Sequence, residues 1–177
     1  MPPEPVLVLD IGGGSTELVL GQGEHRQAVS MDIGSVRLHE RHLHADPPTR
    51  EEVAACVADI DRHLDESGIP LHRARTVIGT SGTIKTIACG VLGLASYDRE
   101  AFDQAVLPNA ATASFVDDLL ALTVEERRAL PYMHPGRADV IGAGALIWSR
   151  ILHRVPVIEH VVSEADIQHG MAAAIAR

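Results

Sequence analysis

Eight consecutive residues near the amino terminus carry the groups that bind phosphate and a divalent cation: Asp10-Ile11-Gly12-Gly13-Gly14-Ser15-Thr16-Glu17. Three consecutive glycines let the backbone approach an anion closely and turn its N–H groups toward it. Ser15 and Thr16 add hydroxyl donors, and Glu17 is an acid within reach of the loop. Asp10 ends an apolar segment, where a carboxylate is costly unless it meets a cation, so Mg²⁺ bridging Asp10 to phosphate is the natural partner. The segment predicts a phosphate-binding loop.

Two other interpretations of this loop compete with phosphate binding. An ordinary β-hairpin also uses glycines for its turn dihedrals, but the acid before the glycines and the hydroxyls and acid after them favour phosphate. A dinucleotide-binding fingerprint requires glycine at the position of Glu17 and a helix after it, whereas Leu18-Val19-Leu20-Gly21 continues as a strand. The loop is therefore expected to join two strands.

A second string of small residues, Gly79-Thr80-Ser81-Gly82-Thr83, lies between an expected strand and an expected helix. Its free N–H groups and the helix dipole can face a phosphate or a nucleotide, so phosphate binding is expected here as well. With Lys85 and Thr86 the string nearly matches a P-loop, but Ile84 stands where that motif requires glycine before the lysine. A capped helix start without a ligand is the alternative.

Two further segments leave alternatives open. Gly142-Ala143-Gly144-Ala145 lies within an expected helix, where each glycine costs about 1 kcal/mol unless something approaches closely. A ligand and a neighbouring helix are equally favoured as that close neighbour. A basic segment follows the third expected strand and contains His39, His42 and His44 with Arg37 and Arg41. Because it shows no metal-ligand spacing, a solvated basic turn is favoured over a track for a polyanion.

Composition excludes several classes of protein. The chain of 177 residues fits one domain and has a net charge of −9, which argues against a general nucleic-acid binder because such proteins need a positive field. It has neither an apolar run of about 20 residues nor a signal peptide at its start. Cys56 and Cys89 lack metal-ligand spacing. We therefore expect a soluble cytoplasmic domain over residues 1–177, with two buried thiols and no membrane contact.

Hydrophobic periodicity predicts the first elements. Residues 6–9, 16–20 and 27–32 form three strands, and the connections are short enough to require an antiparallel meander. Thr49 and Glu52 form a capping box that opens a helix, and this helix stops before Gly68.

The later elements alternate between strand and helix. Expected in order are a strand over 75–79, a helix over 83–91, two or three helices between 97 and 135, one of them opened by a capping box at Thr123 and Glu126, a helix over 137–152, a strand over 157–162 and a closing helix over 166–177. This order predicts an α/β fold of the ribonuclease-H-like type. Its five-stranded mixed sheet would have the order 3-2-1-4-5 with helices on both faces and a helical insertion at about 97–136.

Five segments together resemble, in order, the exopolyphosphatase and guanosine pentaphosphate phosphohydrolase family: DIGGGSTELVLG, MDIGSVRLHERHLHADPPT, GTSGTIKTIA, MHPGRADVIGAGAL and SEADIQHGMAAAIA. The resemblance covers nearly the whole chain. It implies the actin, Hsp70 and sugar-kinase superfold, in which two ribonuclease-H-like lobes close on phosphate and magnesium.

The resemblance also implies roles for individual residues. Asp10 and Glu17 match the acidic residues that hold magnesium or another divalent cation, and Glu17 would order the attacking water. Residues 12–16 match the loop that grips the terminal phosphates, and residues 79–83 match the loop at the counterpart of the nucleotide site. Family members carry a further lobe before the first strand, with a first phosphate loop and the proposed general base, and that lobe is absent here. Lys85 and Gln168-His169 also depart from the family pattern.

The implied activity is release of terminal orthophosphate from polyphosphate or guanosine pentaphosphate by metal-assisted attack of water. A lobe of a sugar or carboxylate kinase and a non-catalytic module that binds polyphosphate or an alarmone are the alternatives. Half of a cleft preserves little of the positioning that phosphoryl transfer needs, so this chain alone is expected to be inactive. The surface facing the absent lobe would be partly apolar, which predicts self-association as a homodimer.

Overall fold

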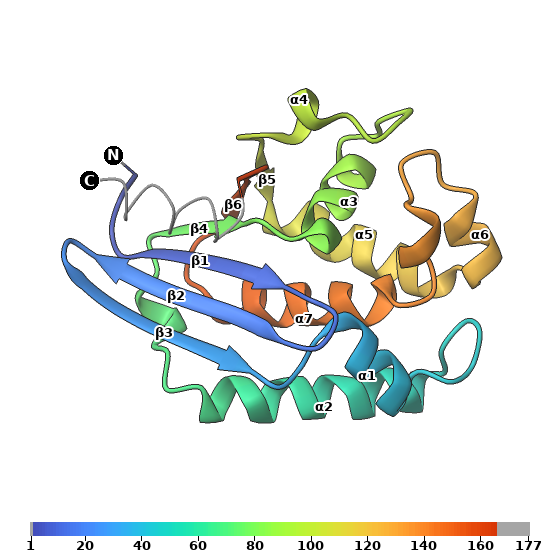
Figure 1. The fold of residues 1–177 in the computed structure, drawn as a ribbon, viewed down its shortest axis with the longest axis horizontal. Helices are drawn as coiled ribbons and strands as arrows, with labels where there is room; N and C mark the ends of the chain where they lie inside the picture. Colours follow the sequence, from blue (N-terminus) through green and yellow to red (C-terminus); the bar gives the residue numbers. More distant parts are fainter. Residues whose placement is uncertain (1, 166–177) are drawn as a thin grey trace.

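The computed structural model describes residues 2–165, which form one mixed sheet with helices packed on it (Figure 1). The sheet has the strand order β3-β2-β1-β4-β6-β5. Its strands are β1 (Val6–Ile11), β2 (Thr16–Gln22), β3 (His25–Met31), β4 (Thr76–Gly79), β5 (Val106–Pro108) and β6 (Glu159–Val162). β1, β2 and β3 form an antiparallel meander, β4 pairs in parallel with β1, and β6 pairs in parallel with β4.

This order confirms the ribonuclease-H-like arrangement, but the predicted number of strands is wrong. The expected order 3-2-1-4-5 corresponds to β3-β2-β1-β4-β6, and β5 adds a sixth strand at the edge. β5 lies inside the segment that was expected to be helical only. Its three residues are too short to show strand alternation, and they become a strand by pairing antiparallel with β6, with Val106 opposite Val161.

The helices include both of the expected capping boxes. Thr49 Oγ1 accepts from the Glu52 N–H at 3.2 Å, and the Glu52 carboxylate accepts from the Thr49 N–H at 2.9 Å. The same reciprocal pair occurs at Thr123 and Glu126. The helices are α1 (Ser35–His42), α2 (Arg50–Glu66), α3 (Gly82–Val91), α4 (Arg99–Phe102), α5 (Asn109–Ala121), α6 (Val124–Arg128) and α7 (Ile141–Arg154), with 3₁₀ turns η1 (Leu71–Arg73) and η2 (Pro135–Arg137). The helix predicted over 137–152 is α7, which begins four residues later than predicted.

Helix α1 corrects the interpretation of the basic segment as a solvated turn. Its N-cap residue is Gly34, which has no side chain to satisfy the first N–H groups, so the usual start signal is missing from the sequence. The N–H groups of Ser35 and Val36 instead donate to the carbonyls of Gly12 and Gly13, both at 2.9 Å. The helix start is stabilised by residues far away in the chain.

The core lies on one face of the sheet. Leu7, Leu9 and Ile11 of β1 are at most 4% exposed, whereas the alternate residues, including Asp10, are half-buried. α3 and α7 cover the buried face, since a side chain at Gly79 would meet Ile84 and Trp148. Both cysteine thiols are buried, as expected. The closing helix predicted over 166–177, with Gln168-His169, lies outside the described residues.

The glycines of α7 make room for neighbouring elements. A Cβ at Gly144 would lie 2.8 Å from Thr83 Cγ2 and 3.3 Å from Ser35 Cβ, so α7 passes directly against the starts of α3 and α1. A Cβ at Gly142 would lie 3.3 Å from Leu120 Cδ2. The close neighbour that these glycines require is therefore protein, and the ligand alternative is not needed.

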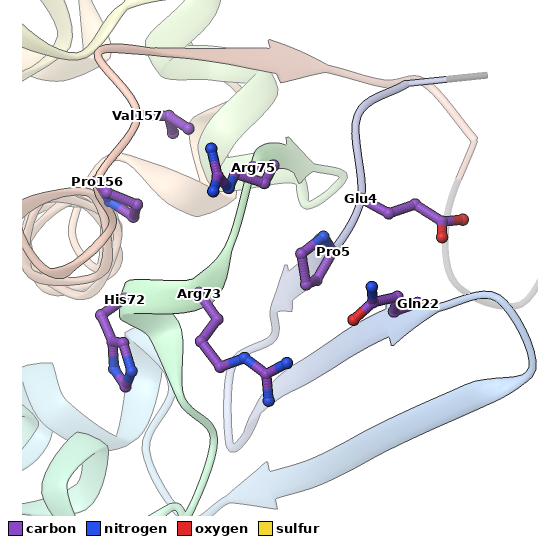
Figure 2. A pocket seen from close by; sticks show the side chains of 8 residues that line it. All are labelled: Glu4, Pro5, Gln22, His72, Arg73, Arg75, Pro156 and Val157. Carbon is purple, nitrogen blue, oxygen red and sulfur yellow. The ribbon is translucent and has the colours of Figure 1, made fainter.

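A cavity of about 600 Å³ opens at the end of the sheet where β1 begins, opposite the end that carries the glycine loop (Figure 2). It is lined by Glu4, Pro5, Gln22, His72, Arg73, Arg75, Pro156 and Val157. Within residues 2–165, no helix is both long and apolar enough to cross a membrane.

Candidate phosphate-binding site

The glycine loop, residues 12–15, closes the hairpin between β1 and β2 as a tight turn. The Gly12 N–H donates to the Ser15 carbonyl at 2.8 Å. The sheet register places Ile11 opposite Thr16 and Asp10 opposite Glu17, so both acids flank the loop on facing strands. The structure thus confirms that the loop joins two strands.

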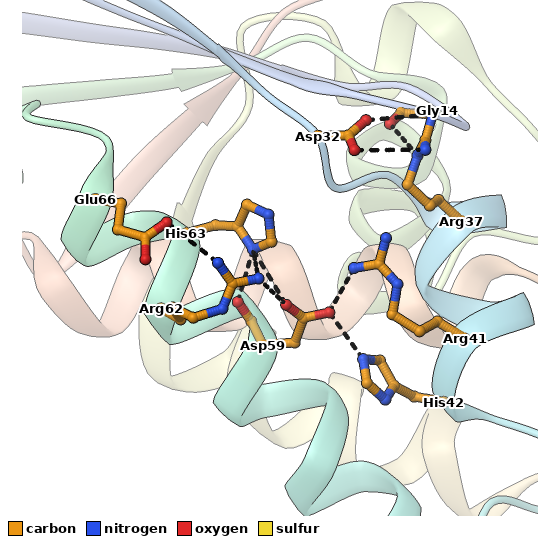
Figure 3. A network of polar contacts seen from close by, with 9 residues as sticks. All are labelled: Gly14, Asp32, Arg37, Arg41, His42, Asp59, Arg62, His63 and Glu66. Atoms are coloured by element: carbon orange, nitrogen blue, oxygen red, sulfur yellow. Dashed lines mark hydrogen bonds and ion pairs between the residues drawn. The ribbon is translucent and has the colours of Figure 1, made fainter.

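The carbonyl groups of the glycine loop are bound by α1. Gly12 and Gly13 accept from the first N–H groups of that helix, and Gly13 also accepts from the Arg37 N–H at 3.1 Å. The Arg37 guanidinium donates from Nε to the Gly14 carbonyl at 3.0 Å and pairs with Asp32 at 3.2 Å (Figure 3). All three glycine carbonyls are therefore held on one side of the loop.

The N–H groups of the loop are left for a ligand. Among the described residues, the backbone N–H groups of Gly13, Gly14 and Ser15 have no hydrogen-bond acceptor. Gly13 and Gly14 are also exposed. Successive backbone N–H groups without acceptors in a turn can bind an anion, and we refer to these three N–H groups as the nest. The loop has the donors that a phosphate group requires.

The two acids beside the loop lie opposite each other on paired strands. Directly opposed residues on antiparallel strands have Cβ atoms about 5 Å apart, and like charges there repel. Glu17 Oε1 accepts from Ser15 Oγ at 2.6 Å and from Ser30 Oγ at 2.8 Å, which fixes its orientation.

These residues fit a magnesium ion held jointly with a substrate. Residues 2–165 contain no group of three or more metal-binding side chains. Magnesium commonly uses one or two carboxylates together with phosphate oxygens and water. Asp10 and Glu17 meet that requirement when a phosphate lies on the loop.

The hydroxyls expected to bind phosphate have other partners. Thr16 Oγ1 donates to the Ile33 carbonyl at 2.8 Å and is fully buried, because strand alternation turns Thr16 to the face opposite Glu17. The Ser15 hydroxyl donates to Glu17. The structure brings the Ser15 backbone into the nest and separates the Thr16 side chain from it.

The second loop, residues 79–83, uses its hydroxyls internally. Thr80 donates to the Leu9 carbonyl from both its N–H, at 3.0 Å, and its Oγ1, at 3.1 Å. Ser81 Oγ accepts from the Ile84 N–H at 3.2 Å as the N-cap of α3. Thr80, Ser81 and Thr83 are at most 4% exposed. These contacts match the capped helix start.

Arg137 covers the second loop, and sequence reasoning missed it. Its guanidinium lies where a side chain on Gly82 would have to go, and its Nη1 donates to Thr86 Oγ1 at 3.0 Å. Lys85 is turned elsewhere, because its Nζ pairs with Glu164 at 3.1 Å and donates to the Glu164 carbonyl at 2.8 Å. The only signal for Arg137 was its place in the segment MHPGRADVIGAGAL.

The two loops lie at the same end of the sheet, where β1 and β4 end. Thr80 is bonded to Leu9, the residue before Asp10, and Gly144 of α7 touches both Ser35 and Thr83. Ligands of open α/β sheets bind at the carboxyl ends of the strands, as at this end of β1 and β4.

A network around Asp59 holds α1, and with it the glycine loop, against α2 (Figure 3). Asp59 pairs with Arg41 at 2.6 Å and His42 at 2.8 Å on α1, and with Arg62 at 2.7 Å and His63 at 3.2 Å on its own helix. Burial would raise the pKa of Asp59, but hydrogen bonds from His42, Arg41 and Arg62 outweigh burial and hold its pKa well below its usual range. Asp59 thus stays ionised.

Comparisons with known proteins agree with this fold. The chain is 40% identical to exopolyphosphatase 2 of Mycobacterium tuberculosis over 97% of its own length and 56% of that protein's. The crystal structure of an exopolyphosphatase-like protein superposes with a TM-score of 0.92 at 40% identity, covering 99% of this chain and 61% of the other. The PPX-GPPA enzyme of Aquifex aeolicus superposes with a TM-score of 0.88 at 31% identity, covering 98% and 57%.

The chain therefore spans little more than half the length of these relatives. Their structures share its fold over nearly all of its residues. The model of the Ppx/GppA phosphatase family matches residues 1–176. The chain belongs to the Ppx/GppA phosphatase family.

Proposed function

We propose that this chain binds the terminal phosphates of inorganic polyphosphate on the glycine loop and forms one wall of an exopolyphosphatase-type hydrolytic site. One observation carries the proposal. The carbonyls of Gly12, Gly13 and Gly14 are bound by α1 and Arg37, whereas the adjacent N–H groups have no acceptor among residues 2–165. A loop that served only as a hairpin would not need its carbonyls sorted to one side.

In this proposal each residue at the loop has a defined task. The N–H groups of Gly13, Gly14 and Ser15 hold the terminal phosphate in place. Asp10 and Glu17 would hold the divalent cation, which supplies neutralisation of phosphate charge. Glu17, oriented by Ser15 and Ser30, accepts a hydrogen bond from the attacking water and aligns it.

We propose further that a second lobe completes the site, and that residues 1–177 form one domain without activity of their own. The nest at Gly13 and Gly14 is exposed, so within residues 2–165 nothing excludes water from a bound phosphate or faces it from the other side. The free, buried thiols of Cys56 and Cys89 suit a reducing compartment, which supports a cytoplasmic location.

Binding of tripolyphosphate by calorimetry tests the role of the loop. Gly13→Val should weaken binding about tenfold, because a branched side chain would obstruct the N–H groups of the nest. Gly136→Val is a matched control, since Gly136 is also exposed and its nearest neighbour is an ordinary 3.5 Å away. Equal affinities in the two variants would leave only a hairpin turn.

Phosphate release from polyphosphate with magnesium tests the need for a second lobe. The 177-residue chain alone should release phosphate no faster than background, and adding a separately expressed first lobe from a relative should restore release. Sedimentation at several concentrations tests self-association of the chain alone. Robust turnover by this chain alone would overturn the two-lobe proposal.

Guanosine pentaphosphate is a second candidate substrate, favoured by a pocket beside the second loop. A cavity of about 420 Å³ is lined by Tyr97, Tyr132, Arg99, His134 and Arg137 among others. Aromatic rings can stack on a base and arginines can hold phosphates. Tyr132→Ala should weaken binding of guanosine pentaphosphate while leaving tripolyphosphate binding unchanged, and the opposite pattern would exclude this role for the pocket.

A further inference from the structure

We propose that the cavity at the beginning of β1 is a second anion site, separate from the glycine loop, that binds an inorganic oligophosphate (Figure 2). The two sites lie at opposite ends of β1, whose six residues span about 20 Å. The inference depends on neither hydrolysis nor the proposed roles of Asp10 and Glu17.

Arginines without ion-pair partners within residues 2–165 line this cavity and extend beyond it. Arg73 and Arg75 line it, and Arg26 lines an adjoining cavity of about 450 Å³. None of the three has an ion pair or a side-chain hydrogen bond within residues 2–165. Elsewhere in the same range, most arginines are paired with carboxylates: Arg37, Arg41, Arg62, Arg99, Arg150 and Arg154.

Hydrogen bonds join the segment that carries Arg73 and Arg75 to the segment before β1. The Arg75 N–H donates to the Pro5 carbonyl at 2.8 Å, and Thr76 Oγ1 donates to the Pro3 carbonyl at 2.8 Å. The segment before β4 is thereby fastened to the segment before β1. Pro5, Gln22 and Arg73 line both cavities, so the two form one continuous concave surface with Arg73 between them.

Among residues 2–165, the one acid that lines this surface is Glu4, and its carboxylate has another partner. Its Oε2 accepts from the Gly23 N–H at 2.9 Å, and it makes no ion pair with the arginines. The surface is therefore positive in a chain whose net charge is −9. A positive concave surface attracts anions, and each of its guanidinium groups can donate hydrogen bonds to phosphate oxygens.

The lining points to a particular chemical class of anion. Guanidinium groups bind phosphate oxygens with two parallel hydrogen bonds, and three separate guanidinium groups match several linked phosphates better than one. Within residues 2–165 the two cavities have no Phe, Tyr or Trp in their lining, and their only rings are the small imidazoles of His72 and His25, so a nucleobase would find no large ring on which to stack. An inorganic oligophosphate satisfies both observations.

Calorimetry with tripolyphosphate in magnesium-free buffer tests the second site. The double variant Arg73→Gln with Arg75→Gln should weaken the binding event at this site about tenfold or more and leave the event at the glycine loop, because it removes two charge-assisted contacts. The double variant Arg50→Gln with Arg128→Gln is the matched control, since both residues are exposed and unpaired within residues 2–165 and neither lines the two cavities. An equal loss in the two double variants would mean that net charge alone is measured and would overturn the site.

Further arms identify the ligand. Orthophosphate should bind at least tenfold more weakly than tripolyphosphate, and ATP should gain nothing from its base; tighter binding of ATP that depends on Arg73 would overturn the assignment to an inorganic ligand. The Gly13→Val variant separates the two sites, because it should leave the Arg73-dependent component intact. With long-chain polyphosphate, loss of affinity in both Gly13→Val and the arginine double variant would show that one polyphosphate molecule reaches both sites. Loss of affinity in the arginine double variant for short polyphosphates alone would show that the ligand is a free oligophosphate. Arg26→Gln provides a second test should the double variant lose its thermal unfolding transition.

Discussion

The two loops rich in glycine, serine and threonine have similar compositions and opposite environments. Residues 12–15 lie in an exposed hairpin whose N–H groups have no acceptor within residues 2–165. Residues 79–83 are nearly buried, their hydroxyls bind Leu9 and the start of α3, and Arg137 covers Gly82. Composition marks both segments as able to bind phosphate, but the partners supplied by the fold decide which donors remain available.

The largest expected effect is a loss of stability in Gly34→Ala, which adds a methyl group beside the first loop. Gly82→Ala adds the same group at the second loop for comparison. A Cβ at Gly34 would lie 2.5 Å from the Gly13 carbonyl carbon and 2.6 Å from Gly14 N, and these backbone atoms cannot give way. Gly34→Ala should lower the free energy of unfolding by about 3 kcal/mol and weaken tripolyphosphate binding about tenfold. Gly82→Ala meets the flexible end of Arg137, so it should cost less than about 1 kcal/mol.

Chemical denaturation and calorimetry on both alanine variants measure this contrast. Similar losses of stability would mean that both loops are equally constrained, and the comparison would fail.

Acid should lower the free energy of unfolding through His160, which lies under the second loop. Burial lowers the pKa of His160 to about 4, and its ring packs edge-on against Trp148 beneath Gly79. The unfolded chain binds a proton at His160 below about pH 6.5 while the folded chain does not, so stability should fall as pH drops from about 6.5 to 4, by up to about 3 kcal/mol.

Unfolding free energies measured across this range check the His160 prediction. His160→Gln should flatten the slope between pH 6.5 and 4. The variant should keep the loss below about pH 3.8 that comes from protonating Asp59, whose folded pKa is depressed. An unchanged slope in His160→Gln would assign the effect to other groups.

A smaller effect should come from Asp10→Asn, which tests the proposed cation-binding acids beside the first loop. With magnesium present, Asp10→Asn should bind tripolyphosphate about tenfold more weakly than the parent chain, because one carboxylate ligand is lost. Without magnesium the two should bind alike. Calorimetry at several magnesium concentrations measures both values, and a magnesium dependence in Asp10→Asn as large as that of the parent chain would contradict the assigned role.

The smallest effect should come from Thr80→Val. This variant removes the hydroxyl bond to the Leu9 carbonyl and should cost about 1 kcal/mol of stability with no change in tripolyphosphate affinity. Thermal unfolding and calorimetry measure the two quantities separately. If affinity fell together with stability, the second loop would contact the ligand directly and the contrast between the loops would need revision.

Features with local causes could be predicted from the sequence. Both capping boxes, at Thr49 and Thr123, depend on residues three positions apart, and the structure contains both. Helix α1 and strand β5 could not be predicted, because the first is capped by carbonyls of Gly12 and Gly13 and the second exists through pairing with β6. These elements are stabilised by tertiary contacts that leave no periodic pattern.

The candidate site divides in the same way. The glycine loop and its flanking acids were recognisable because they are contiguous, whereas Arg37 and Arg137 reach the two loops only through folding. The burial of Thr16 could have been predicted, since it shares strand parity with Leu18 and Leu20 and must face the core with them. The alternation of buried and partly exposed residues along β2 predicts a buried Thr16, although the motif alone suggests a phosphate-binding hydroxyl.

The short sixth strand has a consequence for how molecules of this protein can join. Pro108 ends β5 at the edge of the sheet, where it offers no N–H group for a further strand, and only three residues are available for pairing. Natural proteins use short edge strands and proline to prevent edge-to-edge aggregation. Strand addition at this edge is therefore blocked, and any assembly on that side of the molecule must be built from side-chain contacts rather than from a sheet that continues between chains.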